Sequence, residues 1–526
     1  MIASHKQLKR FQKAENIDMN KNSIIKGTLI LTIAGFSTRF IGFFYRIYLS
    51  KMLGAENMGV YQLIFAVYGV CFTIYASGIQ TSISSLVAAE VGRKNTKNTL
   101  KILKIGMFFS FCIALFLSFL VYNGSEYIAY RFLSEPRCAP SLRVLAIVFP
   151  FCGMTSCING YYYGLKKAGI PATTQLIEQI IRVLTVYMIA TYVGKGNMEI
   201  TCELAIFGVV LGEIGSDLFN LFSLFFERKP KLENTLLLRK RTIIHRLLKL
   251  SIPLTSNRLL ISILSSFEAV LIPTMLRKSG LSVSESLSIY GVLTGMSIPF
   301  IMFPSAITNS LAVMLLPTIS EAQALNNDLL INKTASISIK FSIIIGILST
   351  GIFIIFGEPL GIVIFNNKSS GTFLMILSWL CPFMYLTTTL GSIINGLGKT
   401  HITFFNTVIG ISIRILFVII LIPKYGISSY LISLLVSQLI ISFLDVLAIV
   451  RNATIDFNAY NSILKPSLCM LFIGFLSLRT YQYLSKITVI QPLILLLISC
   501  FVLCIGYFAM LFITKSLNKR EFAKGK

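Results

Sequence analysis

The sequence predicts an all-α, polytopic membrane protein with 14 transmembrane helices, arranged as two six-helix repeats around a central cavity plus two C-terminal helices. Three observations lead to this prediction. Hydrophobic residues make up 55% of the 526 residues, charged residues only 13%, and the mean hydropathy is +0.78. Such a chain has too little polar surface to cover a soluble globule. Apolar runs of the roughly 20 residues that cross a bilayer recur along the chain, and one stretch of sequence occurs twice.

The predicted spans form a first lobe at 24–226, a second lobe at 247–450 and an appended pair at 463–514. The 14 spans are 24–50, 60–89, 101–122, 142–163, 171–193, 203–226, 247–276, 288–316, 334–356, 373–394, 402–422, 427–450, 463–483 and 488–514. Residues 1–23 are polar and basic, and the first span is too long and too charged for a cleaved signal peptide. We therefore expect the first span to remain as a transmembrane helix.

The formal net charge of +26 is distributed unevenly between the two sides of the predicted topology. With the first span counted from Gly27, 26 of the 47 Lys and Arg lie in the N-terminus, the even-numbered loops and the C-terminus, 9 lie in odd-numbered loops and 12 within spans. This positive-inside pattern predicts that residues 1–23, the basic linker 227–246 and the tail 515–526 are cytoplasmic, near anionic lipid headgroups. The protein is thus expected in a cell membrane with both termini in the cytoplasm, and nucleic acid is not expected as a partner.

Side chains for metal binding or covalent catalysis are scarce in this sequence. The ten cysteines lie mostly inside predicted spans without zinc-site spacing, and His5, His245 and His401 lie at or outside the membrane edge. No predicted loop exceeds about 25 residues, which disfavours a membrane-embedded glycosyltransferase or ligase. We therefore expect no metal site, no catalytic residue and no enzymatic activity.

A shift of 232 positions superimposes residues 150–182 on residues 382–414 without a gap. Ten of the 33 positions are identical, including Arg182 with Arg414. Because each repeat has an even number of spans, the second would enter the membrane from the same side as the first. Two like halves around an axis along the membrane normal leave a cleft between them. The duplication predicts an alternating-access transporter.

Charged residues within the spans are the first site candidates. Arg39 and Arg46 are seven residues apart and share one helical face, and a charge near the bilayer centre costs about 2.5 to 3.5 kcal/mol on insertion scales. A shift of 229 positions aligns Arg39 with Glu268 of the seventh span. These two residues form either a structural salt bridge across the cleft or a switchable, substrate-binding pair. Arg258, also in the seventh span, is a further candidate for substrate binding.

Five other polar residues within the spans each allow a functional and a structural interpretation. Gln80 and Asn309, aligned by the same shift, either hydrogen-bond polar groups of a substrate or pack as core amides. Glu213, Asp217 and Asp445 either bind a coupling cation or are buried, hydrogen-bonded acids.

One charged pair is expected to be purely structural. Glu178 and Arg182 are four residues apart on the fifth span, so they should neutralise each other. Arg414 has no such neighbour on its own helix, because Gly410 occupies the place of Glu178.

Several segments, taken in order, resemble one known family. They are GFFYRIYLSKMLGAENMGVYQLIF, YASGIQTSISSLVAAE, SIPLTSNRLL, YGVLTGMSIPFIMFPSAITNSLAVMLLPTISEA and INGLGKT. They resemble the stage V sporulation protein B family, a branch of the polysaccharide and lipid II flippases within the multidrug, oligosaccharidyl-lipid and polysaccharide exporter superfamily. The resemblance covers essentially the first twelve spans.

This resemblance implies fourteen helices around a central cavity formed chiefly by helices one, two, seven and eight. It implies that the substrate is an undecaprenyl-pyrophosphate-linked glycan, here the lipid II-type precursor of spore cortex peptidoglycan, flipped from the inner to the outer leaflet. Arginines of helix one line the cavity of the related flippases, and Arg46 matches one of them. Those flippases also carry basic residues in helices two and eight, whereas 60–89 and 288–316 contain no Lys or Arg.

The residues leave two other transport functions open. A cation-coupled multidrug exporter would need an acidic cavity, and a flippase for another lipid-linked polysaccharide would share the basic one. No cofactor is expected beyond a coupling Na⁺, H⁺ or the membrane potential, and the peptidoglycan synthesis machinery is a candidate partner.

The charge asymmetry makes a topological prediction. Lys240→Cys, in the basic linker, should react with a membrane-impermeant maleimide only after permeabilisation of the cells, because positively charged loops remain in the cytoplasm. Lys368→Cys, in an odd-numbered loop, is the matched control and should react in intact cells. Labelling of Lys240→Cys from outside would contradict the topology.

Overall fold

The computed structural model describes the fold of most of the chain, and all regular elements in the described residues are helical. The described residues are 2–93, 95–195, 201–227, 238–452, 457–487 and 491–517. Residues 228–237 of the predicted linker and 518–526 of the predicted tail lie outside them. The all-α prediction is therefore confirmed for the described part of the chain.

The first lobe is built from helices that follow the predicted spans closely. Its elements are α1 (Ile2–Phe72), η1 (Thr73–Ser77), α2 (Gly78–Gly92), α3 (Thr96–Asn123), α4 (Ser125–Tyr127), η2 (Ile128–Phe132), α5 (Cys138–Ala146), α6 (Phe149–Gly164), α7 (Gly169–Lys195) and α8 (Cys202–Phe225).

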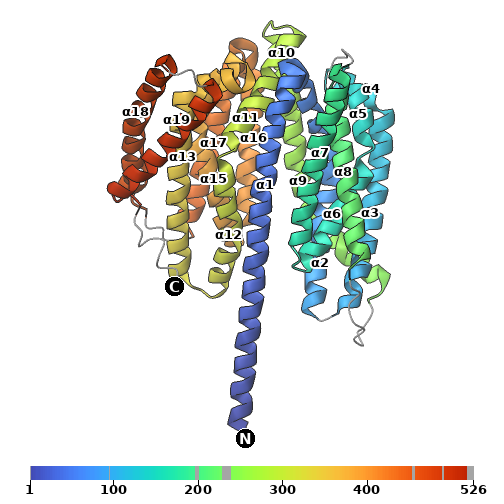
Figure 1. Cartoon of the computed structure of the whole chain (residues 1–526). Coiled ribbons are helices and arrows are strands. Elements are labelled where there is room, and N and C mark those ends of the chain that lie inside the picture. Colours follow the sequence, from blue (N-terminus) through green and yellow to red (C-terminus); the bar gives the residue numbers. More distant parts are fainter. Residues whose placement is uncertain are drawn as a thin grey trace.

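The second lobe and the appended pair contain the remaining helices. The second-lobe elements are α9 (Lys240–Lys278), α10 (Val283–Gly291), η3 (Val292–Ser297), α11 (Ile298–Met302), α12 (Ser305–Ala324), α13 (Asp328–Phe365), α14 (Lys368–Leu377), η4 (Ser378–Leu380), α15 (Cys381–Gly396), α16 (Thr400–Tyr425) and α17 (Ile427–Val450). The appended elements are η5 (Tyr460–Leu464), α18 (Lys465–Ile487) and α19 (Pro492–Ile513). In Figure 1, α1 runs between the group α2–α8 and the group α12–α19.

Eleven helices in the described residues are long and apolar enough to cross a membrane. The count becomes twelve if α5 and α6, which are bent by 47° at their junction, form one span. The chain is therefore a multi-pass membrane protein by length and composition. The exposed large apolar side chains on these helices, such as Phe116 and Phe475, are those that a lipid environment covers.

Gly54 divides α1 into two arms: the first contains the predicted span 24–50, and the second, continued by η1 and α2, contains the predicted span 60–89. Its backbone has φ 73° and ψ 177°, a conformation that residues with a Cβ rarely adopt, whereas the residues on either side of it are helical. A Cβ at Gly54 would meet no atom within 4 Å, so the backbone angle and not the available space requires glycine. The chain reverses here and returns toward the end of the molecule where α2 lies (Figure 1).

The predicted span 288–316 is not one continuous α-helix. It contains the π-helical segment η3, then α11, and a break before α12 begins at Ser305. Pro299 and Pro304 explain the irregularity, because proline has no N–H to donate and its ring clashes with the preceding turn. π-Helical turns of this kind are frequently found at functional sites.

Candidate functional site

A cavity of about 650 Å³ lies between the two lobes. The first lobe lines it with both arms of α1 and with α7, and the second lobe with the irregular segment from η3 to α12. Its polar lining residues are Arg39, Tyr45, Arg46, Tyr61, Gln62, Gln179, Arg182, Thr294, Ser305 and Asn309. Helix seven, which the resemblance implied as a wall, is α9 and supplies no lining residue among those described; α7 takes that place.

The lining of this cavity is cationic. It holds Arg39, Arg46 and Arg182 but no carboxylate among the described residues. Only Arg182 has a counter-charge, donating from Nη2 to Glu178 four residues earlier on α7, as the sequence predicted. Neither Arg39 nor Arg46 forms an ion pair or a hydrogen bond within the described part of the chain. Because unpaired charge in an apolar slab is costly, such a site favours an anionic ligand.

The predicted site residues divide into two groups in the structure. Arg39, Arg46 and Asn309 line the cavity, whereas Arg258, Glu268 and Gln80 do not. The Asn309 amide donates to the carbonyl oxygen of Ser305 at 2.8 Å, so its nitrogen is already held by its own helix. Its position beside the cavity leaves the functional interpretation open.

Arg258 connects α9 to the first lobe and does not reach the cavity. Its Nη1 donates to the carbonyl oxygen and the hydroxyl of Ser77, both at 2.7 Å, and to the hydroxyl of Thr81 at 3.1 Å. Ser77 ends the π-helical segment η1. In this structure Arg258 therefore forms an inter-lobe contact.

The expected pairing of Arg39 with Glu268 is wrong. Glu268 is 5% exposed and forms a bidentate ion pair with Arg414, whose Nε and Nη2 donate to its two carboxylate oxygens at 2.7 and 3.0 Å. The Tyr430 hydroxyl also donates to Glu268, at 2.9 Å. Two guanidinium nitrogens and one hydroxyl satisfy this buried carboxylate, so it has no need of Arg39.

The three acids considered for ion coupling are buried, and two of them have clear hydrogen-bond donors. Asp217 accepts from the Thr155 hydroxyl at 3.2 Å, and Asp445 accepts from the Asn406 amide at 2.7 Å. Glu213 is buried on α8, one turn before Asp217. No group of three or more metal-ligating residues occurs in the part of the chain that the structure describes.

Several lining residues were not identified from the sequence. Arg182 was treated as structural because its i,i+4 partner was evident, although it also faces the cavity. Gln62 and Gln179 were not identified because neither is charged and neither belongs to a recognisable spacing pattern in the sequence. Gln62 could have been found from the turn at Gly54, because it lies as far after the turn as Arg46 lies before it.

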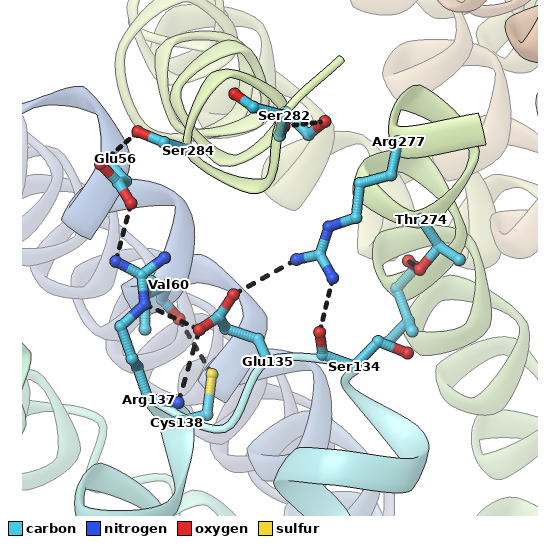
Figure 2. A network of polar contacts seen from close by, with 12 residues as sticks. Glu56, Val60, Ser134, Glu135, Arg137, Cys138, Thr274, Arg277, Ser282 and Ser284 are labelled. Atoms are coloured by element: carbon cyan, nitrogen blue, oxygen red, sulfur yellow. Dashed lines mark hydrogen bonds and ion pairs between the residues drawn. The ribbon is translucent and has the colours of Figure 1, made fainter. Parts of the chain in front are cut away.

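A network of ion pairs joins the two lobes at the end of the molecule where α10 lies (Figures 1 and 2). Glu135, 2% exposed in the loop before α5, accepts from Arg137 Nε at 2.7 Å and from Arg277 Nη2 of α9 at 3.2 Å. Arg137 also donates to Glu56 at 2.7 Å, and Glu56 accepts from Ser284 of α10 at 2.5 Å. The hydrogen bond to Glu135 raises the pKa of Arg137, so Arg137 stays charged. We call this network of Glu56, Glu135, Arg137, Arg277 and Ser284 the latch.

The backbones of α1 and α10 approach each other closely beside this latch. A Cβ added to Gly291 of α10 would lie 2.0 Å from the carbonyl oxygen of Ala55, and one added to Gly59 would lie 2.2 Å from that of Leu287. Side chains at either glycine would therefore force α1 and α10 apart. Backbone contact and ion pairs together close this end of the cavity.

Comparison with known proteins identifies the family. The family model described as "Polysaccharide biosynthesis protein" matches residues 24–323, more than half of the chain. The chain belongs to the polysaccharide biosynthesis protein family. Curated proteins are similar over most of this chain, and the predicted resemblance to stage V sporulation protein B is confirmed.

Two relatives from Bacillus subtilis (strain 168) are informative. Stage V sporulation protein B is 24% identical over 89% of this chain and 91% of its own length, and Lipid II flippase MurJ is 21% identical over 75% and 76%. A solved structure of Lipid II flippase MurJ in an inward closed conformation has a TM-score of 0.69, with 17% identity over 92% of this chain and 98% of that one. An inward-facing multidrug resistance MATE family transporter has a TM-score of 0.63, with 14% identity over 79% and 96%. These structures show the fold.

The bidentate pair of Glu268 and Arg414 makes a stability prediction. Glu268→Gln should lower the free energy of unfolding by about 3 to 5 kcal/mol, because a buried Arg414 would lose its counter-charge. Thermal unfolding of the purified protein in detergent measures this loss. The exchange Glu268→Arg with Arg414→Glu should recover part of it. A fully stable Glu268→Gln variant would show that the pair does not hold α9 to α16.

Proposed function

We propose that this protein flips an undecaprenyl-pyrophosphate-linked glycan of the lipid II type from the inner to the outer leaflet of a bacterial cell membrane. The observation that carries the proposal is the inter-lobe cavity, whose described lining contains three arginines and no carboxylate. A pyrophosphate must cross an apolar slab in this reaction. Arginine offers fixed N–H donors to phosphate oxygens and does not deprotonate, so a cavity with three arginines suits this headgroup.

Relatives support the substrate class. One curated relative is named Lipid II flippase MurJ, and another is named Stage V sporulation protein B. By analogy we propose that the substrate of this chain is a lipid-linked peptidoglycan precursor. The proposed process is spore cortex synthesis, and the proposed partner is the peptidoglycan synthesis machinery. A flippase for another lipid-linked polysaccharide remains the second candidate, because helix two and the η3 to α12 segment lack the Lys and Arg of the lipid II flippases.

The same proposal includes fourteen spans with both termini in the cytoplasm. The segment Ile33–Gly92 is 60 residues long and divided at Gly54, so it supplies two crossings. The bent pair α5 and α6 supplies one, and the 27 residues of α7 are long enough for another. The positive-inside asymmetry then places the start of α1 inside and the latch on the outer side.

With this orientation the described conformation is closed toward the outside. The ion pairs of Glu135 and the glycine contacts of Gly59 and Gly291 must separate before the substrate can leave outward. Na⁺, H⁺ or the membrane potential supplies the driving force in this scheme. Glu213 and Asp217 are the proposed coupling groups, because both are buried acids on α8. A multidrug exporter is disfavoured, since a cationic drug would meet the three arginines.

Reconstitution tests the proposed function directly. Proteoliposomes of the wild type should translocate fluorescent lipid II, and Arg39→Ala and Arg46→Ala should each lower the rate at least tenfold, as the loss of one charge-assisted hydrogen bond to phosphate predicts. Arg143→Ala is the control, because Arg143 pairs with the exposed Glu126 and lies outside the cavity. Translocation of only a non-peptidoglycan lipid-linked glycan would favour the second candidate, and translocation of neither lipid would contradict the proposal.

The latch makes a separate prediction about opening. Glu135→Gln should weaken both arginine contacts and increase the population open to the outside about tenfold. Cys138, 0% exposed beside the latch, is a native reporter, and its maleimide labelling rate should rise by the same factor when followed by mass spectrometry.

Glu126→Gln removes an exposed salt bridge at the same end of the molecule and should leave Cys138 labelling unchanged. Equal labelling rates in wild type and Glu135→Gln would show that the glycine contacts alone keep this end closed.

A further inference from the structure

Three hydrogen-bonding atoms at one end of the cavity are buried and unpartnered. They are Tyr45 Oη, Gln62 Nε2 and Arg182 Nε, and all three residues line the cavity. A buried polar atom without a partner costs about as much as a lost hydrogen bond, so such atoms are uncommon in folded proteins. Their convergence on one cavity indicates a place that is completed by a ligand.

The chemistry of these atoms specifies the ligand as an anion. The Arg182 Nε and the Gln62 amide nitrogen can only donate, and the Tyr45 hydroxyl can donate. Arg46, with no partner among the described residues, lies in the same cavity, and the charge of Arg182 acts on it. Two guanidinium groups held near one another without a shared carboxylate favour a ligand with several negatively charged oxygens.

The turn at Gly54 explains why these residues meet at one depth. Arg46 lies eight residues before Gly54 and Gln62 eight residues after it, on the two arms of α1. Arg39 lies about 10 Å farther along the first arm, because seven residues of α-helix rise 1.5 Å each. The cluster is therefore a distinct part of the cavity, separate from Arg39.

Arg414 supplies an internal comparison for Arg182. The two arginines occupy matched positions in the duplicated sequence. Arg414 uses both Nε and Nη2 on Glu268, whereas Arg182 uses Nη2 on Glu178 and leaves Nε without a partner. Arg414 does not line the cavity. The Nε of Arg414 is thus engaged within its own lobe, whereas the Nε of Arg182 remains a donor for a ligand.

We propose that Arg182, together with Gln62, Tyr45 and Arg46, forms a pyrophosphate subsite that makes the cavity select a diphosphate over a monophosphate headgroup. The proposal rests on the proposed function for the identity of the lipid, but the anion specificity belongs to the cluster itself. A second phosphate group brings the additional oxygens that the Arg182 Nε and the Gln62 amide require. A single phosphate on Arg46 leaves those two donors unpaired.

Binding of short-chain lipid phosphates to the purified full-length protein tests this subsite. Farnesyl diphosphate and farnesyl monophosphate are compared by isothermal titration calorimetry in detergent. The wild type should bind the diphosphate at least tenfold more tightly. Arg182→Lys keeps the positive charge beside Glu178 but loses the planar fork, so it should weaken diphosphate binding about tenfold and reduce the preference. Gln62→Leu should do the same without touching the Glu178 pair.

Arg414→Lys is the matched control. It alters the equivalent arginine of the second lobe, so it should lower thermal stability while keeping the diphosphate preference. If Arg182→Lys does not fold, Gln62→Leu decides the question. Equal wild-type affinity for the two lipids, or an unchanged preference in both cavity variants, would overturn the proposal.

The subsite and the transport function can fail independently. Diphosphate-selective binding that depends on Arg182 supports the subsite even if reconstituted protein does not translocate lipid II. Translocation of lipid II with an unchanged rate in Gln62→Leu and an unchanged preference in Arg182→Lys would keep the proposed function and overturn the subsite.

Discussion

A guanidinium group inside an apolar slab is costly without a counter-charge, and the two lobes place the counter-charge of their matched arginines on different helices. In the second lobe, Arg414 on α16 is neutralised by Glu268 on the neighbouring helix α9. In the first lobe, Arg182 on α7 is neutralised by Glu178 on its own helix. Arg182 therefore needs no carboxylate from α1. The shift of 229 positions aligns Glu268 with Arg39 of α1, so an arginine occupies the matched position in the first lobe. Because the carboxylate of the first lobe lies on α7 and not on α1, the α1 wall of the cavity remains cationic.

As a result, the two lobes line the cavity with side chains of different charge. All three lining arginines come from the first lobe, whereas the second lobe contributes polar but uncharged side chains, including Thr294, Ser305 and Asn309. An anion in the cavity would thus be held mainly by one lobe. The other lobe could move against it while breaking only weaker, neutral hydrogen bonds. Such an arrangement suits a site that must release its ligand at the opposite side of the membrane.

The sequence predicted the helical membrane fold well because apolar length is a local property that needs no knowledge of packing. It also placed Arg39, Arg46 and Asn309 beside the cavity. It failed for Glu268, whose partner Arg414 lies 146 residues away, because aligned positions in two repeats do not reveal which neighbouring helix a side chain faces. It treated the pair of Arg182 as complete, since an i,i+4 pattern identifies a partner but not the donors that remain unused.

Helix α9 links the two lobes, because its contacts alternate between the lobes along its length. Arg258 binds the first lobe near the middle of α9, Glu268 binds the second lobe ten residues farther on, and Arg277 binds the first lobe at the latch near the end of the helix. Pro253 and Pro273 lie inside the helix, where each removes a backbone hydrogen bond. The bidentate pair of Glu268 keeps this part of α9 with the second lobe, whereas Arg258 and Arg277 on either side of it bind the first lobe. Separation of the lobes at the latch therefore requires α9 to release Arg277, and Pro273, four residues earlier, places a flexible point between this contact and Glu268.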